Sequence, residues 1–123
     1  MIGGVIGSVL VVDDDAEFRK LARRLLAASG LTVVGEADSV AAALEAASRL
    51  EPSAVLLDVE LPDGDGVTLA RELAALPWRP RIVLTSVDES ITNNDEARNA
   101  GARAFVQKAE LPTAPLAQLF GDE

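Results

Sequence analysis

A short apolar run that ends in a single carboxylate constrains the fold of this chain more than any other feature. Residues 54–57 are apolar, Asp58 follows them directly, and Pro62, Gly64 and Gly66 then break the pattern. Such a run, bounded by turn residues, is typical of a strand buried on both faces of a parallel sheet. Asp58 is therefore predicted at the carboxyl end of a buried strand, the edge at which open parallel sheets bind ligands.

Further short apolar runs alternate with segments of helical periodicity along the chain, which predicts five strands and five helices. The strands are placed at residues 8–12, 31–37, 54–58, 81–85 and 104–107. The helices run from a cap at Asp15 to Ser29, from a cap at Asp38 or Ser39 to Leu50, and over about 66–76, 92–100 and 115–120. Alternation of this kind predicts an α/β fold with helices on both faces of one parallel sheet. Because crossovers are right-handed, we expect a flavodoxin-like, doubly wound five-stranded sheet of order 2-1-3-4-5.

The first helix shows how its faces are expected to divide. Apolar side chains recur at helical spacing and are predicted to face the core, namely Phe18, Leu21, Leu25 and Leu26. Basic side chains line the other side, namely Arg19, Lys20, Arg23 and Arg24. They are predicted to form a solvated face, with a docking patch as the less favoured alternative.

The predicted topology brings polar residues from separate strands to one edge of the sheet. Strands 1 and 3 are neighbours in the order 2-1-3-4-5, so Asp13 and Asp14 should converge with Asp58. Thr85 ends the fourth strand and Lys108 follows the fifth. Taken singly, these residues are explained as helix caps, a strand-end hydroxyl and a surface lysine. Their arrival at one edge is the stronger observation and indicates a functional site.

The residue types at this edge indicate phosphoryl chemistry. Three carboxylates repel one another unless a cation lies between them. The chain has no cysteine and no histidine, which excludes the usual zinc sites and Ser-His or Cys-His nucleophiles and leaves a hard ion held by oxygen, Mg²⁺, Ca²⁺ or Mn²⁺. Mg²⁺ suits the site best, because it prefers a few carboxylates together with water and a phosphate oxygen. Asp58 can attack phosphorus to give an aspartyl phosphate. Lys108 can then place its charge, and Thr85 its hydroxyl, on the phosphoryl oxygens.

Length and charge restrict the remaining possibilities. At 123 residues we expect one domain over residues 8–120, after a loose segment at residues 1–7. The net charge of −9 argues against nucleic-acid binding by the domain itself. The apolar start is too short to span a membrane and lacks the basic region and cleavage site of a signal peptide, so we expect a cytoplasmic protein without membrane contact. The lone tryptophan, Trp78, is predicted at the opposite end of the fourth strand from the site.

Together these motifs resemble the receiver (response-regulator) domain of bacterial two-component signalling over nearly the full chain. The matching motifs are VVDDD with Asp13 and Asp14, LLDVELPDGDG with Asp58, VLTS with Thr85 and FVQK with Lys108. The segment GARAFVQKAEL resembles the subgroup that is usually joined to a helix-turn-helix output domain. No such domain is seen in these residues, and the short last helix favours a fragment of a longer regulator over a stand-alone receiver.

The resemblance implies a set of roles for the site residues. Asp58 would accept a phosphoryl group from a histidine kinase or a small acyl-phosphate donor. Mg²⁺ would be held by the carboxylates of Asp14 and Asp58, by Asp13 largely through water, and by the main-chain carbonyl of Glu60. The Glu60 side chain is a further candidate for an effect on the lifetime of the acyl phosphate. A domain of this family is a signalling domain that assists its own phosphorylation and dephosphorylation, and not an enzyme.

The resemblance also implies a switch. Movements of the Thr85 hydroxyl and of the Phe105 ring would report phosphorylation to the face formed by the fourth helix, the fifth helix and the fifth strand. A self-dimer through the last-helix face is a further expectation. Phe105 lacks the hydroxyl of the commoner tyrosine, so plain core packing is its alternative role. Ala109 stands where many receivers have proline, and the Lys108–Ala109 peptide is therefore expected to be trans.

Two other functions fit part of the pattern. A haloacid-dehalogenase-type phosphatase would use Asp13 and Asp15, but Glu17 and Phe18 stand where that family needs Thr or Val, and the chain has no room for a cap domain. We predict Asp15 to be a helix cap instead. The second alternative is a phosphate-independent receiver-like module for interaction or dimerisation, which the intact set of site residues disfavours. Two further acids near Asp58 are predicted to be turn formers, namely Asp63 and Asp65.

Overall fold

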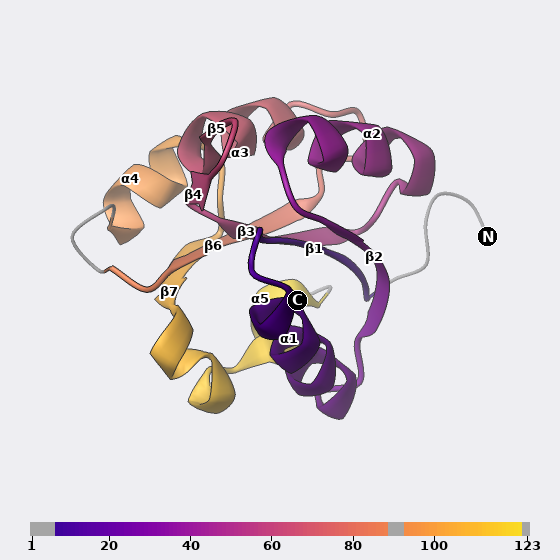
Figure 1. Ribbon diagram of the computed structural model, residues 1–123, viewed down its shortest axis with the longest axis vertical. Coiled ribbons are helices and arrows are strands. Elements are labelled where there is room, and N and C mark those ends of the chain that lie inside the picture. Colours follow the sequence, from indigo (N-terminus) through magenta and orange to yellow (C-terminus); the bar gives the residue numbers. More distant parts are fainter. Residues whose placement is uncertain (1–6, 89–92, 122–123) are drawn as a thin grey trace.

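The computed structural model describes residues 7–88 and 93–121 as a five-stranded parallel sheet between two layers of helices (Figure 1). The strand order is β2-β1-β3-β6-β7, which is the predicted order 2-1-3-4-5. The predicted fold class is therefore confirmed. The predicted segment 1–7, apart from Gly7, and the predicted start of a helix at Thr92 lie outside the described residues.

The predicted elements are present with small changes at their ends. The strands of the main sheet are β1 (Ser8–Val12), β2 (Thr32–Ala37), β3 (Ala54–Asp58), β6 (Arg81–Ser86) and β7 (Ala104–Gln107). The helices are α1 (Ala16–Ala28), α2 (Val40–Leu50), α3 (Gly66–Ala74), α4 (Asn94–Asn99) and α5 (Leu116–Phe120). Three short elements were not predicted: β4 (Glu60–Leu61) and β5 (Gly64–Asp65), which form a hairpin, and the 3₁₀ helix η1 (Lys108–Thr113).

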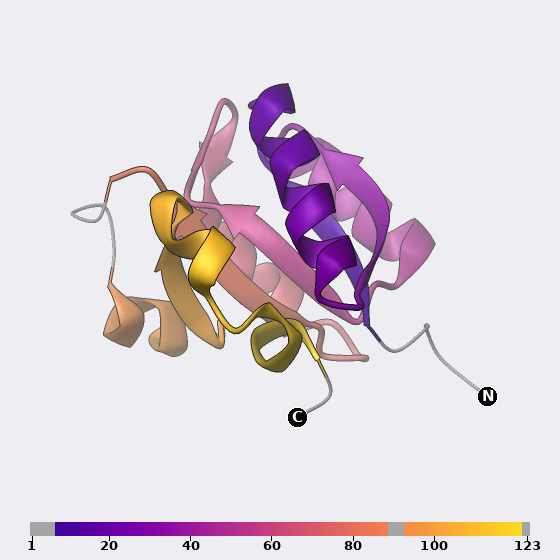
Figure 2. The ribbon, with the colours of Figure 1, turned by 90° about the horizontal axis from the view of Figure 1, so that it is seen from below.

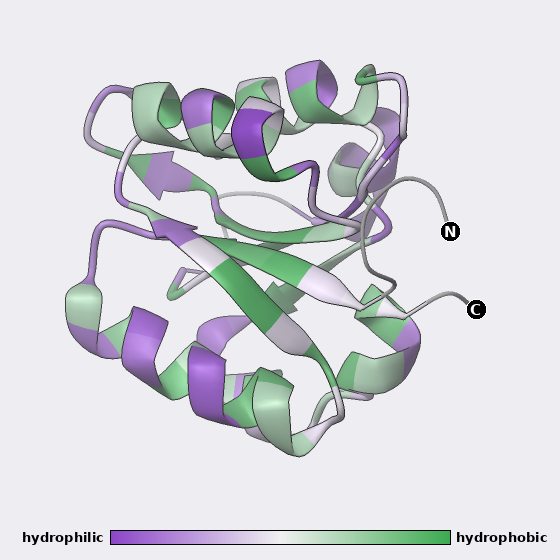
Figure 3. Ribbon diagram, turned by 90° about the vertical axis from the view of Figure 1, so that its right-hand side faces the viewer, coloured by the Kyte–Doolittle hydropathy of each residue, from purple (hydrophilic) through white to green (hydrophobic). Residues whose placement is uncertain are grey.

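The core has one layer on each face of the sheet, because successive side chains of a strand point to opposite faces. Leu10 and Val12 of β1 pack with α2, α3 and α4, whereas Val9 and Val11 pack with α1 and α5. Figure 2 shows α1 and α5 on the same face. Every residue of β1 and β3 is buried. Figure 3 shows largely hydrophobic strands between helices in which hydrophobic and hydrophilic residues alternate, as expected for helices that cover a doubly wound sheet.

The predicted faces of α1 are confirmed except at Leu21 and Arg19. Leu21 is 40% exposed, and the core stripe is formed by Phe18, Ala22 and Leu26, which are spaced four residues apart and so lie on one face of the helix. Arg19 is not simply solvated. Its guanidinium donates to Glu36 Oε1 at 2.7 Å and to the Asp13 carbonyl at 2.7 Å, so the side chain ties α1 to the end of β1 and to β2.

Other local predictions are confirmed. Asp15 caps α1 by accepting hydrogen bonds from the backbone N–H groups of Glu17 and Phe18, and Ser39 caps α2. The Lys108–Ala109 peptide is trans, since the described residues contain no cis peptide bond. Among the described residues, no helix has both the length and the apolar character that crossing a bilayer requires.

Trp78 lies at the end of the sheet away from Asp58, as predicted. Its Nε1–H donates to the carbonyl of Pro52 at 3.0 Å, just before β3 begins. Asp58 ends that strand, about 20 Å further along an extended chain. We therefore expect tryptophan emission to change little when Mg²⁺ is added to the metal-free protein, and a fluorescence titration measures this. Strong quenching by the metal would contradict this placement.

Candidate functional site

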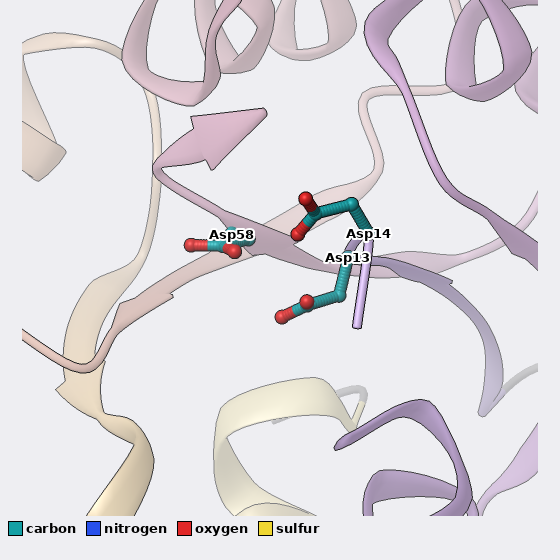
Figure 4. A group of neighbouring side chains, drawn as sticks. All are labelled: Asp13, Asp14 and Asp58. Carbon is teal, nitrogen blue, oxygen red and sulfur yellow. The ribbon is translucent and has the colours of Figure 1, made fainter. Parts of the chain in front are cut away.

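Three carboxylates meet at the carboxyl edge of the sheet. Asp13 and Asp14 follow β1, Asp58 ends β3, and oxygen atoms of the three lie within 4.8 Å of one another. Figure 4 shows the three side chains gathered at the ends of these two strands. Asp13 is fully buried, Asp58 is 6% exposed, and Asp14 is exposed. The site is therefore anchored in the core and open to solvent on one side.

Sheet register explains why these residues meet. Val12 pairs with Leu57, so the residues that follow, Asp13 and Asp58, are neighbours across β1 and β3. Asp58 in turn pairs with Thr85 of β6. Parallel strands in register end at the same edge, and their last side chains therefore form one surface.

Lys108 already neutralises part of this negative charge. Its Nζ lies 2.7 Å from Asp13 Oδ2 and 3.5 Å from Asp58 Oδ2. The side chain is 14% exposed, and its ammonium stands 4.3 Å from the centroid of the Phe18 ring. The lysine is the first residue of η1, directly after β7, so the last strand of the sheet delivers it between the two buried carboxylates.

Main-chain groups hold the other oxygen of each buried carboxylate. The Asp15 N–H donates to Asp13 Oδ1 at 2.9 Å, and the Glu60 N–H donates to Asp58 Oδ1 at 3.2 Å. Each carboxylate is thus fixed by one backbone donor, and its second oxygen faces Lys108. This fixed orientation is what a nucleophile or a metal ligand needs.

Thr85 lies next to Asp58 across β3 and β6, and Phe105 lies one strand further along the sheet, in β7. The Thr85 hydroxyl is buried and donates to the Val106 carbonyl of β7 at 2.7 Å. Phe105 is half-buried, packs at the margin of the α2–α4 core layer, and donates its N–H to Asn94 Oδ1 at 2.9 Å. The Thr85 hydroxyl is thus hydrogen-bonded to β7, and Phe105 of β7 is hydrogen-bonded to the first residue of α4.

Burial and mutual repulsion shift the acid–base properties of the site. Burial raises the pKa of Asp58 to about 6, with a further rise from the charge of Asp13, while the Glu60 N–H and Lys108 oppose this. Burial alone would lower the pKa of Lys108, but its hydrogen bond and charge interaction with Asp13, together with Asp58, raise it. The lysine is therefore a permanent cation, and Asp58 is the group whose charge depends on its surroundings.

The raised pKa of Asp58 predicts a pH effect on stability without metal. The native state favours the protonated carboxyl, so the stability that Asp58 contributes is complete below its usual pKa of 3.8 and is lost as pH rises through about 6. With allowance for solvent at the sheet edge, the loss is about 2 kcal/mol. In EDTA, Asp58→Asn should be more stable than wild type by this amount at pH 8 and equal to it near pH 4, as urea denaturation would measure. If the difference in unfolding free energy between Asp58→Asn and wild type were the same at pH 4 and pH 8, this prediction would be contradicted.

The two acids predicted as turn formers have further roles that the sequence did not reveal. Asp63 lies in the turn of the β4–β5 hairpin, but its carboxylate also accepts from the backbone N–H groups of Val40 and Ala41 in α2. Asp65 is the N-cap of α3, where it accepts from the Val67 N–H. The capping pattern was visible for Asp65 in the sequence, whereas the partners of Asp63 lie more than twenty residues away.

The donor set fits a hard divalent cation. Three carboxylates offer oxygen atoms within 4.8 Å of one another, and the exposed Asp14 leaves an approach from solvent. Oxygen donors of this kind, supplemented by water, are what Mg²⁺ and Mn²⁺ prefer. Among residues 7–88 and 93–121, the ion pairs of Lys108 are with Asp13 and Asp58, and Asp14 is the exposed carboxylate of the cluster.

Comparisons with known proteins agree with this geometry. A family model described as the response regulator receiver domain matches residues 9–118. The chain is 32% identical over 100 residues to the chemotaxis protein CheY of Bacillus subtilis, covering 81% of this chain and 83% of that protein. It is 37% identical over 109 residues to protein-glutamate methylesterase/protein-glutamine glutaminase 4 of Myxococcus xanthus, covering 87% of this chain and 31% of that protein.

A solved structure is similar over almost the same length. The BeF3-activated N-terminal receiver domain of RstA from Klebsiella pneumoniae matches with a TM-score of 0.78 and 34% identity, covering 91% of this chain and 94% of that one. Transcriptional regulators are also among the similar curated proteins, and the chain spans 51% and 48% of two of them. The chain thus spans about half or less of several relatives that it matches.

The family model covers most of the chain, and the sheet has the order predicted from the alternation of strands and helices. The pocket of Asp13, Asp14 and Asp58 is typical of the phosphoacceptor site of receiver domains, which are signalling domains. The chain therefore belongs to the receiver domain family of two-component response regulators.

Proposed function

We propose that Asp58 is the phosphoacceptor of this domain. The observation that carries the proposal is the placement of one nearly buried carboxylate, oriented by the Glu60 N–H, within 3.5 Å of the Lys108 ammonium. A carboxylate oxygen of Asp58 attacks phosphorus and forms a new P–O bond. With a phosphohistidine donor the P–N bond breaks and the imidazole nitrogen keeps the electron pair; with acetyl phosphate, acetate leaves.

The neighbouring residues have distinct roles in this transfer. Lys108 places a positive charge beside the phosphoryl oxygens, and the Thr85 hydroxyl exchanges the Val106 carbonyl for one of these oxygens. The carboxylates of Asp13, Asp14 and Asp58 and the Glu60 carbonyl would hold Mg²⁺, with Mn²⁺ as a substitute. The ion would neutralise charge on the carboxylates and on the transferring phosphoryl group.

The output follows from the elements that the site residues contact. Thr85 contacts β7, and Phe105 of that strand contacts Asn94 at the start of α4. Rearrangement at Thr85 would therefore alter the face formed by α4, β7 and α5. A histidine kinase is the expected donor. A self-dimer through the α5 face, and a DNA-binding output domain in a longer protein, are further parts of the proposal.

The direct test is intact mass after incubation with acetyl phosphate. A receiver should gain one phosphoryl group with Mg²⁺ and remain unmodified when EDTA is present. No adduct over a range of Mg²⁺ concentrations, with the protein folded, would favour the alternative of a phosphate-independent interaction or dimerisation module.

The Glu60 side chain is expected to influence loss of the phosphoryl group. Glu60 is exposed, and its main chain lies directly against Asp58, so its carboxylate can act as a general base that takes a proton from an attacking water. Glu60→Ala should lengthen the lifetime of the acyl phosphate severalfold, as measured by the decay of the adduct in intact mass. Glu60→Gln keeps the size of the side chain and should behave like Glu60→Ala. An unchanged decay rate in both variants would dispose of this role.

A further inference from the structure

The β4–β5 hairpin beside the acceptor is fastened to α2 by one side chain. Asp63, at the turn of the hairpin, accepts from the Val40 N–H at 2.7 Å through Oδ1 and from the Ala41 N–H at 3.1 Å through Oδ2. These are the first two residues of α2, whose N–H groups have no partner inside the helix. Ser39 caps the next donor, Ala42 N, at 3.1 Å. The N-terminus of α2 is thus capped by one local residue and one remote residue.

Close packing supports this fastening. A side chain at Gly64 would place its Cβ 2.9 Å from Val40 Cγ2, so the hairpin backbone lies directly against α2. Leu61 of the hairpin packs against the same core layer that α2 contributes to. The helix itself is held to the sheet by three fully buried alanines, which are Ala43, Ala46 and Ala47. It therefore provides a fixed support for the hairpin.

The hairpin connects this support to the acceptor. Its first residue, Glu60, donates its N–H to Asp58 Oδ1 at 3.2 Å. Glu60 pairs with Asp65, and Leu61 pairs with Gly64, so each arm has only two residues. The turn at Asp63 is therefore separated from Glu60 by only two residues, Leu61 and Pro62.

We infer that Asp63 is a positioning residue for the acceptor site: it holds the hairpin to α2 and thereby fixes the main chain of Glu60 beside Asp58. The inference rests on the proposed function, in which the Glu60 N–H orients the acceptor and the Glu60 carbonyl is a metal ligand. The hydrogen bonds from Val40 and Ala41 lower the pKa of Asp63, so its carboxylate is ionised at neutral pH and suits the helix N-terminus.

Two variants that each remove a cap of α2 distinguish a role in positioning Glu60 from a role in stabilising the helix. Asp63→Ala and Ser39→Ala each remove a cap of α2, and each should lower Tm by roughly 3–5 °C. Only Asp63→Ala should speed hydrogen exchange at the Glu60 amide in metal-free protein and weaken Mg²⁺ binding, by about tenfold. Asp63→Asn keeps an acceptor oxygen and should restore most of the affinity. Exchange is followed by NMR, and Mg²⁺ affinity by NMR titration.

Two results would overturn the inference. If the rate of hydrogen exchange at the Glu60 amide and the Mg²⁺ affinity are both unchanged in Asp63→Ala, then Asp63 is only a helix cap. An equal effect of Ser39→Ala would show that α2 stability, and not the hairpin contact, controls the site. A wild-type protein that binds no Mg²⁺ and accepts no phosphoryl group would instead overturn the proposed function, and the Glu60 exchange rates would still decide whether Asp63 holds the hairpin.

Discussion

Asp58→Asn is expected to abolish phosphorylation by acetyl phosphate, while the wild-type chain gains one phosphoryl group in intact mass. The substitution keeps the shape of the side chain and the hydrogen bond from the Glu60 N–H, but a carboxamide is not a nucleophile toward phosphorus. The expected effect is complete loss of the adduct under conditions that saturate the wild type. In EDTA at pH 8 the same variant should be more stable than wild type, so loss of folding would not explain the missing adduct.

A matched surface variant provides the control. Asp95 is exposed on α4 and forms an ion pair with Arg98 at 3.8 Å, away from the carboxylate cluster, so Asp95→Asn should be phosphorylated like the wild type. An adduct on Asp58→Asn would contradict the assignment and would point to Asp13 or Asp14 as the acceptor. Peptide mapping of that adduct would then identify the residue.

Lys108→Met is expected to destabilise the metal-free domain by about 3 kcal/mol at pH 8, because breaking a buried pair leaves an uncompensated charge. Here two carboxylates, Asp13 and Asp58, would face each other at the buried edge without the ammonium that now lies 2.7 and 3.5 Å from them. Loss of the lysine should raise the pKa of Asp58 beyond about 6. Asp58 would then be protonated at pH 5, and the loss should be clearly smaller there than at pH 8. Urea denaturation in EDTA at pH 5 and pH 8 measures the stability lost in Lys108→Met.

Lys20→Met is the control for this effect. Lys20 is exposed on α1, with its ammonium 3.8 Å from Glu17, and an exposed pair of this kind contributes little. The control should change stability by less than about 0.5 kcal/mol at both pH values. Added Mg²⁺ should recover part of the stability lost in Lys108→Met, since the ion can neutralise the carboxylates of Asp13 and Asp58 in place of the lysine. An equal loss at pH 5 and pH 8 would mean that packing against Phe18, and not charge, is what Lys108 provides.

Much of the fold followed from the sequence because its information is local. An apolar run bounded by turn residues indicates a buried strand, and helical periodicity with a capping residue such as Asp15 or Ser39 fixes where a helix begins. Strand order then followed from the right-handed crossover rule. The hairpin after Asp58 and η1 after Lys108 were missed, because two-residue strands and a single 3₁₀ segment leave no periodicity to detect.

The sequence by itself determined the parallel sheet, its order, and the edge at which Asp13, Asp14, Asp58, Thr85 and Lys108 gather. Tertiary structure alone decided that Lys108 lies between two carboxylates, that the Thr85 hydroxyl faces β7, and that Asp63 caps a helix far away in the chain. It also decided that Leu21 is exposed while Ala22 is buried. The physical reason is that periodicity depends on neighbours within one or two turns, whereas a side chain chooses its hydrogen-bond and charge partners from whatever the folded chain brings within a few ångströms.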